Sequence, residues 1–108
     1  MDNNRELLIR FHPIKDHPNY GVNALGNICN YKKKTILKPI EDDRGYLRVR
    51  LDGKRELVSR IVAENYIPNP YNKPNVTYKD GNRNNVRFDN LKWASNSDIK
   101  RLKRHKIT

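Results

Sequence analysis

Disulfides, membrane-spanning segments and common catalytic motifs are all missing from this 108-residue sequence. Its single cysteine, Cys29, can form neither an internal disulfide nor a cysteine zinc site, and we expect it to be a small buried side chain on a strand. No apolar run approaches the ~20 residues of a membrane span, and the first residues lack the pattern of a secretory signal. Glycine-rich phosphate loops, paired carboxylates at a helical spacing and nucleophile motifs are also absent. We therefore expect a soluble, intracellular protein.

Acidic residues are scarce relative to basic ones. The chain has 23 Lys and Arg residues against 12 Asp and Glu residues, a formal net charge of +11, and residues 81–108 alone carry eight basic and two acidic side chains. Such a surface attracts a polyanion, because Lys and Arg release the counterions condensed on its phosphates. No stretch combines this charge with a broad apolar face, so the composition favours nucleic acid over a membrane surface. A chain of this length fits one small domain with a shallow core.

Asn, Asp and Gly residues crowd the segment 75–93. It begins with a short alternation of apolar and polar residues, turns through Asp80-Gly81-Asn82 and crosses a polar, basic loop. Asn and Asp accept left-handed backbone angles and hydrogen-bond to their own main chain, so they collect in the turns of any protein. That general preference does not account for their order. The ordered positions are Asp80, Gly81, Asn82, Asn85, Asn90, Leu91 and Trp93.

The spacing of these residues resembles the ββα-metal core of HNH nucleases, in particular the branch of phage and intron-encoded homing endonucleases. That branch reads roughly Asn-His-x-Asp-Gly-Asn, a few residues, Asn-Asn, and then Asn-Leu-x-Trp. The resemblance implies an α+β fold, in which a small antiparallel sheet is followed by a helix and a ββα-metal (HNH, His-Me finger) unit. It covers about residues 11–101, and it implies a location in the cytoplasm of a bacterial host or of a virus-infected cell.

Three positions depart from the family pattern. The family's general-base His falls on Tyr78, its metal-binding Asp or Asn on Thr77, and its last ligand, usually Asn or His, on Ile99. A phenol with a pKa near ~10 stays protonated at neutral pH and cannot replace an imidazole that titrates near ~6.5. Isoleucine offers a divalent cation no lone pair. Only Asn90 keeps the family residue, whose role there is to hold the metal-bearing loop and the base. We predict a degenerate site with no catalytic residue, metal ligand or cofactor.

The segment 11–28 resembles a small nuclease-associated modular domain that often precedes this HNH branch. The modular pattern has an aromatic, an Ile, then Tyr-x-Val-Ser, a Gly and an Ile. Here Phe11 stands for the usual Trp and Asn23 for the usual Ser. We therefore interpret the sequence as a β-rich modular region over residues 1–56 and a degenerate HNH ββα unit over residues 57–108, joined in one compact chain.

Local patterns predict the strands and turns. The run 7–11 fits either a strand or one helical turn, and Gly26-Asn27 between alternating segments is typical of a hairpin. Two further strands are expected over residues 35–40 and 46–51. Asp52-Gly53 then predicts a two-residue turn into another strand.

Two helices are expected after the sheet. Ser59, at a position where the family commonly has a second His, is suited to cap a helix over 60–66 that Pro68 ends. Ser95 and Asp98 form a capping-box pattern at the start of a basic C-terminal helix. The three histidines lie outside the motif, and we expect each to be exposed or locally bonded. These are His12, His17 and His105.

Two groups of basic residues are expected to contact phosphates. Relatives place the ββα unit against the DNA backbone and add contacts from the preceding sheet, so the partner implied is nucleic acid, double-stranded DNA first, with RNA still open. Phosphate contacts position a protein without reading sequence. From the sheet we select Arg48, Arg50, Lys54 and Arg55. From the ββα unit we select Arg83, Arg87, Lys92, Lys100, Arg101 and Arg104.

Three functions remain open at this stage. The first is a duplex-binding protein derived from an HNH homing endonuclease, without cleavage activity. The second is a working nuclease or nickase that depends on Mg²⁺ or Mn²⁺, with a relocated base or a hydroxide supplied by the metal. The third is a structural factor that associates with RNA or with another protein. The residues Thr77, Tyr78, Asn90 and Ile99 decide between the first two, since they occupy the family's catalytic positions.

Overall fold

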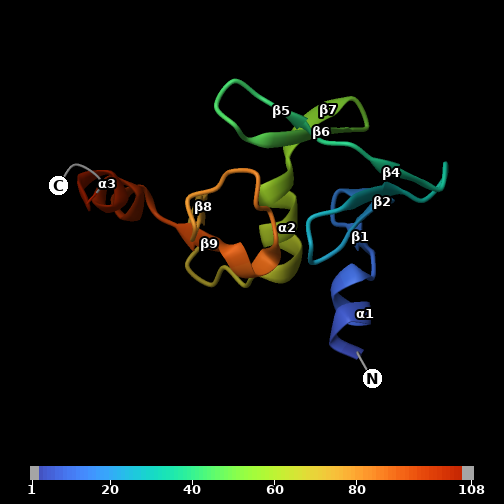
Figure 1. Ribbon diagram of the computed structural model, residues 1–108, viewed down its shortest axis with the longest axis horizontal. Coiled ribbons are helices and arrows are strands. Elements are labelled where there is room, and N and C mark those ends of the chain that lie inside the picture. The colour runs from blue at the N-terminus through green and yellow to red at the C-terminus, as the bar shows by residue number, and fades with distance from the viewer. Residues whose placement is uncertain (1–2, 106–108) are drawn as a thin grey trace.

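Helix α2 (Val58–Tyr66) lies at the centre of the molecule and contacts strands from all three of the small antiparallel sheets in the described chain (Figure 1). The computed structural model describes residues 3–105, with the side chains of residues 6–101. Within this range antiparallel strands and helices are mixed, which confirms the predicted α+β class. None of the described helices combines the length and the apolar character needed to span a bilayer.

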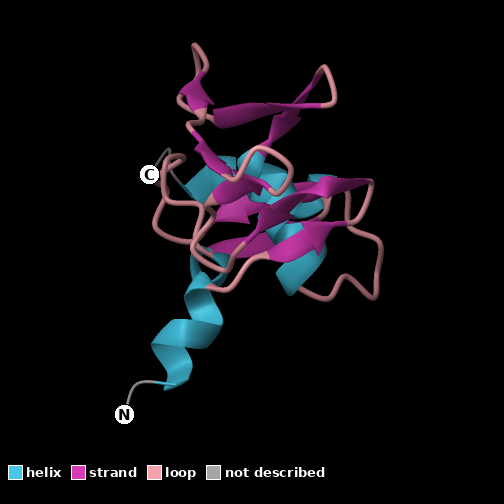
Figure 2. Cartoon of the chain, turned by 90° about the vertical axis from the view of Figure 1, so that its right-hand side faces the viewer, coloured by secondary structure: helices cyan, strands magenta, loops and turns pink. Residues whose placement is uncertain are grey.

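The first sheet is a four-stranded meander that follows helix α1 (Asn3–Ile9). Of the two structures that fit the run 7–11, the helix is therefore the correct one up to Ile9. Helix α1 extends away from the strands (Figure 2), and its last turn is attached where the Leu8 carbonyl accepts the Ala24 N–H at 3.1 Å. The predicted hairpin at Gly26-Asn27 joins the second and third strands, and Cys29 is buried as expected. The strands are β1 (His12–Ile14), β2 (His17–Val22), β3 (Ile28–Asn30) and β4 (Thr35–Leu37).

The second sheet shows that the prediction of one strand over residues 35–40 is wrong. Strand β4 ends at Leu37, and β5 (Ile40–Glu41) belongs to the second sheet, where it pairs with β6 (Leu47–Leu51). Pro39 lies between the two, and a proline has no N–H to continue a ladder. The Asp52-Gly53 turn into β7 (Lys54–Leu57) is confirmed, with positive φ at both residues, 50° and 81°, as a type I′ hairpin turn requires.

The prediction that Ser59 caps the central helix is also wrong. Helix α2 begins at Val58, its N-cap is Leu57, and no side chain caps it. Ser59 is instead 3% exposed and faces the protein interior. The apolar residues at helical spacing fill the core between the sheets, as an amphipathic helix does. The fully buried side chains of this core are Val22, Ile28, Leu51, Val58, Val62 and Leu91.

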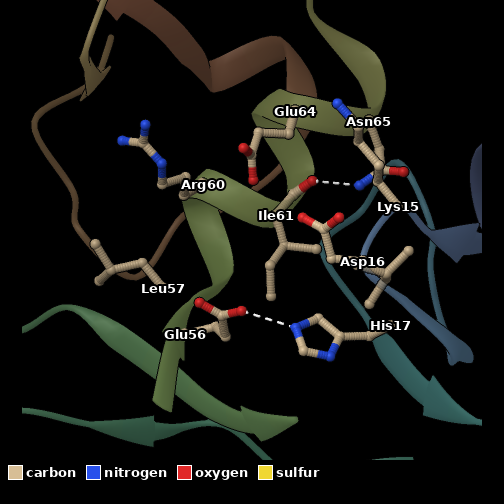
Figure 3. A pocket seen from close by; sticks show the side chains of 10 residues that line it. Lys15, Asp16, His17, Glu56, Leu57, Arg60, Ile61, Glu64 and Asn65 are labelled. Atoms are coloured by element: carbon tan, nitrogen blue, oxygen red, sulfur yellow. Dashed lines mark hydrogen bonds and ion pairs between the residues drawn. The ribbon is translucent and has the colours of Figure 1, made fainter. Parts of the chain in front are cut away.

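His17 lies at the junction between the first and second sheets, and the expectation that it is exposed or locally bonded is wrong. It is 8% exposed, and its ring nitrogens lie 2.7 Å from Asp52 Oδ2 and 2.9 Å from Glu56 Oε2. Figure 3 shows His17 and Glu56 beside helix α2, joined by the second bond. Ionised carboxylates only accept hydrogen bonds, so both bonds are made together by the protonated imidazolium. His12, by contrast, is exposed, and the His105 side chain lies outside the described residues.

From the bonds of His17 at this junction, we predict that the free energy of unfolding of the protein decreases above neutral pH. The bonds to Asp52, and secondarily to Glu56, raise the pKa of His17 above its ordinary value, although burial opposes them. A raised pKa contributes stability that is fully present below ~6.5 and is lost as the pH rises through the folded-state pKa. We expect His17→Gln to lower the free energy of unfolding by about 1–3 kcal/mol at pH 6, and by less at alkaline pH. Urea unfolding of both proteins across this range measures the difference, and parallel pH profiles would contradict the role given to His17.

Candidate functional site

The segment 75–105 folds into two paired strands and a helix. Strand β8 (Asn75–Tyr78) runs antiparallel to β9 (Leu91–Ala94), with Thr77 opposite Lys92 and Tyr78 opposite Leu91. The predicted capping box opens α3 (Asn96–His105): the Asp98 N–H donates to Ser95 Oγ at 3.1 Å, and the Ser95 N–H donates to Asp98 Oδ2 at 2.9 Å. This is the ββα order that the spacing of residues 80–93 predicts.

Asn90 holds the loop between the two strands. It ends a short 3₁₀ turn, η1 (Phe88–Asn90), and is 8% exposed. Its side-chain oxygen accepts the Asp80 N–H at 3.1 Å, while its amide nitrogen donates to Asp80 Oδ1 and to the Asn85 carbonyl, both at 2.9 Å. Asn85 in turn donates to Asp80 Oδ2 at 2.9 Å, and this bond is the main reason why the pKa of Asp80 is lowered. Asp80 is therefore ionised and engaged in shaping its own loop.

Tyr78 and Ser59, which stand where the family pattern has two histidines, are hydrogen-bonded to each other. The Tyr78 hydroxyl donates to Ser59 Oγ at 2.7 Å, joining the end of β8 to the second residue of α2. Burial raises the pKa of Tyr78 above its ordinary value, so the phenol holds its proton more firmly than a free tyrosine. This pair keeps a hydrogen bond across the site but provides no group that accepts a proton at neutral pH.

An open groove gathers the altered family positions. Its volume is about 370 Å³, and its walls include Thr77, Tyr78 and Ile99. Asn90 does not line this groove and acts behind it through Asp80, which does. Of the four positions selected from the sequence, three therefore share one cavity, and the fourth supports its loop. Arg83 and Lys79 give the groove its positive charge.

The groove does not fit the divalent cation that the family resemblance implies. Ile99 contributes only hydrocarbon, and Thr77 offers a single neutral hydroxyl, which donates to the Lys92 carbonyl at 3.3 Å. The Asn90 oxygen already accepts a backbone N–H, so it is turned into the loop. Mg²⁺ is usually held in proteins through one or two carboxylates. The carboxylate in the groove wall, Asp80, accepts hydrogen bonds at both oxygens, from the Asn82 N–H and from the Asn85 and Asn90 side chains. Among residues 6–101, no three His, Cys, Asp or Glu side chains are grouped to hold a metal ion.

The second sheet carries a basic outer face. Arg50 on β6 lies directly opposite Arg55 on β7, and both side chains are exposed, as is that of Lys54. Like charges facing each other across a ladder are destabilising. Arg48 differs, because its Nε donates to Asp42 Oδ2 at 2.8 Å and holds the pKa of Asp42 at about 2. Arg50 and Arg55 therefore share one exposed face, Lys54 pairs with the buried Leu51 on the other face, and Arg48 is held by a carboxylate.

The basic residues selected from the ββα unit fall into two groups. Lys92, Lys100 and Arg101 are exposed on β9 and α3. Arg87 and Arg83 are also exposed, but Arg87 bonds to Asp89 at 3.2 Å, and Arg83 donates to the Arg44 carbonyl at 2.6 Å. The Arg104 side chain lies outside the described residues.

Tyr46 is a site residue that the sequence does not identify. Its ring lies under the Arg83 guanidinium, 4.6 Å from ring centroid to Cζ, and 6.1 Å from the Tyr78 ring. It lines the groove above and also a second groove of about 540 Å³ that includes Arg48 and Arg55. Strand alternation predicts that Tyr46 shares a face with Arg48 and Arg50. Its contacts with Arg83 and Tyr78, however, join residues more than 30 positions apart, and the local sequence gives no sign of them.

Comparisons with known proteins agree with this geometry. No family model matches the chain. Two uncharacterized HNH endonucleases of Acanthamoeba polyphaga mimivirus are similar to it, one 33% identical over 87 residues and the other 32% identical over 90 residues. These alignments cover 77% and 79% of this chain, but 26% and 23% of the relatives. A solved structure of DNA binding and cleavage by the HNH homing endonuclease I-HmuI matches with a TM-score of 0.82 and 26% identity, over 91% of this chain and 59% of that one.

The chain belongs to the HNH endonuclease family. It spans about a quarter of the length of the curated relatives that it matches. The family resemblance predicted from the order of residues 80–93 is therefore confirmed.

Proposed function

We propose that this chain binds double-stranded DNA through an HNH scaffold and does not cleave it. The observation that carries the absence of cleavage is the 2.7 Å bond between Tyr78 and Ser59. A general base must accept a proton near the operating pH, and a half-buried phenol whose pKa is raised does not. The apolar Ile99 in the groove removes the metal route as well, since a hydroxide made by a bound cation needs ligands for that cation.

Charge and exposed basic side chains support the binding half of this proposal. The net charge of +11 is accompanied by the opposed Arg50 and Arg55 and by exposed Lys92, Lys100 and Arg101. The relative with a solved structure is described as binding and cleaving DNA. Duplex DNA is the first choice because the described chain offers few exposed aromatics, which single-strand binding depends on.

A plasmid assay with and without divalent metal tests both halves together. We expect gel-shift binding of supercoiled plasmid and no nicked product in Mg²⁺ or Mn²⁺, and we expect calorimetry to find no saturable Mn²⁺ binding. Tyr78→Phe is the matched variant, because it keeps the ring and removes the hydroxyl. Metal-dependent nicking by the wild type that Tyr78→Phe abolishes would overturn the proposal of a site without cleavage.

Competition among nucleic acids tests the choice of duplex DNA. At one fixed salt concentration we expect duplex DNA to bind more tightly than duplex RNA or either single strand. Tighter binding of duplex RNA would replace DNA by RNA in the proposal. Failure to bind any of them above ~0.1 M salt would contradict nucleic-acid binding and favour a protein partner.

A further inference from the structure

Arg83 joins the ββα loop to the second sheet. Its guanidinium donates to the Arg44 carbonyl at 2.6 Å and stacks on the ring of Tyr46 at 4.6 Å. The next residue, Asn84, donates its side-chain amide to the Gly45 carbonyl at 3.1 Å. These two neighbouring side chains therefore hold residues 44–46, the turn before β6, against the loop that follows β8. We call this contact the bridge.

Two grooves meet at the bridge, and a third adjoins one of them. The groove of the second sheet contains Arg48 and Arg55 and shares Tyr46 with the groove of the altered family positions. That groove in turn shares residues 77–79 with a third, of about 330 Å³, which Lys92 and Arg101 line. Because each groove shares residues with the next, basic side chains occur along all three, from the β6–β7 hairpin to helix α3. Carboxylates line the grooves as well: Glu41, Asp42 and Asp43 the first, Asp80 the second and Asp98 the third.

The geometry of Arg83 suits a structural bond better than a phosphate contact. A guanidinium is a planar fork whose donors are fixed, and here one of them is used by a carbonyl while its face covers a tyrosine ring. A lysine at this position would keep the charge but could reproduce neither the stacking nor the fork. Charge and bridge can therefore be separated by one conservative substitution.

We propose that the three grooves form one continuous track that a single DNA backbone crosses, and that Arg83 is the positioning residue that keeps the two halves of the track in register. This inference rests on the proposed function, since it assigns the path of the same duplex. The two halves are presented as one preorganised surface, which lowers the cost of ordering them on binding. The class of ligand is a polyanionic duplex backbone, and its bases play no part in the argument.

The test removes the charges of Arg50 and Arg55 on the β6–β7 hairpin, both in the wild type and in the Arg83→Lys variant. In each protein it measures how the affinity for duplex DNA depends on the salt concentration. In the wild type, the double change Arg50→Gln with Arg55→Gln should lower the slope of log K against log salt by about 1.8, or about 0.9 for each lost phosphate contact. In Arg83→Lys, affinity at low salt should fall about tenfold, and the same hairpin change should lower the slope by less than about 0.5. Lys92→Gln, on the other half of the track, should lower the slope by about 0.9 in both backgrounds.

Two controls separate the bridge from charge and from folding. Lys32→Gln with Lys33→Gln removes the same two charges from the β3–β4 turn and should leave the slope nearly unchanged. Asn84→Ala breaks the second bond of the bridge without any change of charge, and it should reduce the hairpin's contribution in the same direction as Arg83→Lys. Circular dichroism of each variant confirms that it is folded before its slope is used.

Each outcome has one meaning. If the wild type does not bind duplex DNA, the proposed function fails. If it binds but the hairpin change leaves the slope unaltered, the track ends before the second sheet and this inference is overturned. If Arg83→Lys binds like the wild type, or the hairpin change acts equally in both backgrounds, then Arg83 is an ordinary phosphate contact and the bridge has no positioning role.

Discussion

Raising the salt concentration from ~50 to ~200 mM is expected to weaken duplex binding by this protein about 10³-fold. Six of the basic residues selected from the sequence are exposed, and none of these six forms an ion pair among the described side chains. Six contacts correspond to a slope of about −5 in log K against log salt, because each phosphate neutralised releases about 0.9 of a counterion. The six are Arg50, Lys54, Arg55, Lys92, Lys100 and Arg101.

Fluorescence anisotropy of a labelled duplex across this range measures the slope directly. Arg48, Arg83 and Arg87 are left out of the count because each donates a hydrogen bond to another residue of the protein. A slope close to −8 would mean that these three also reach phosphates when the duplex binds. A slope shallower than about −2 would leave at most two phosphate contacts and contradict a track of the proposed length.

The parts of the fold that the sequence predicts correctly depend on neighbours in the chain. The Asp52-Gly53 turn requires positive φ at both positions, and residues of these types adopt it readily. The Ser95 and Asp98 pair is three residues apart, so its two bonds can be recognised without knowing anything else. The ββα order and the role of Asn90 came from the family resemblance, which summarises longer-range information that composition does not contain.

The errors concern contacts between distant residues. Ser59 has the residue type of an N-cap, yet its hydroxyl meets Tyr78, 19 positions later, and the helix begins one residue earlier without a cap. His17 is enclosed by carboxylates that are 35 and 39 positions away. Local propensity is a weak guide when tertiary contacts compete with it. Tyr46 illustrates the same limit. Strand alternation predicts which face of the sheet it lies on, but not that its ring contacts Arg83.

The meeting of Tyr78 and Ser59 also changes how the two substitutions are understood. In the sequence they are separate departures from the family pattern, each with its own loss of an imidazole. In the structure they form one hydrogen bond that ties strand β8 to helix α2. Neither hydroxyl is left unpaired in a half-buried site, where an unmade hydrogen bond is costly. The pair therefore has a structural role in this chain.

Replacing Asn90 by alanine is expected to have the largest effect on stability among the site residues. The side chain makes three hydrogen bonds, to the Asp80 N–H, the Asp80 carboxylate and the Asn85 carbonyl, from a position that is 8% exposed. Asn90→Ala leaves the Asp80 N–H and the Asn85 carbonyl without this partner in a half-enclosed loop, and it removes one of the two bonds to Asp80 Oδ1, which also accepts the Asn82 N–H at 2.8 Å. Each unsatisfied group costs about 1 kcal/mol or more. We expect the free energy of unfolding in urea to fall by about 2–4 kcal/mol.

Asn82→Ala is the matched control, since Asn82 is exposed in the same loop and its side chain accepts one bond, from the Asn84 N–H at 3.0 Å. Its expected cost is about 0.5 kcal/mol, because water can replace that bond. A difference between the two variants therefore reports the burial of Asn90 and not the loss of an amide as such. If Asn90→Ala remained within about 1 kcal/mol of the wild type, the loop would be held by its backbone turns alone. Asn90 would then be an inherited residue of the family and not the support on which the groove depends.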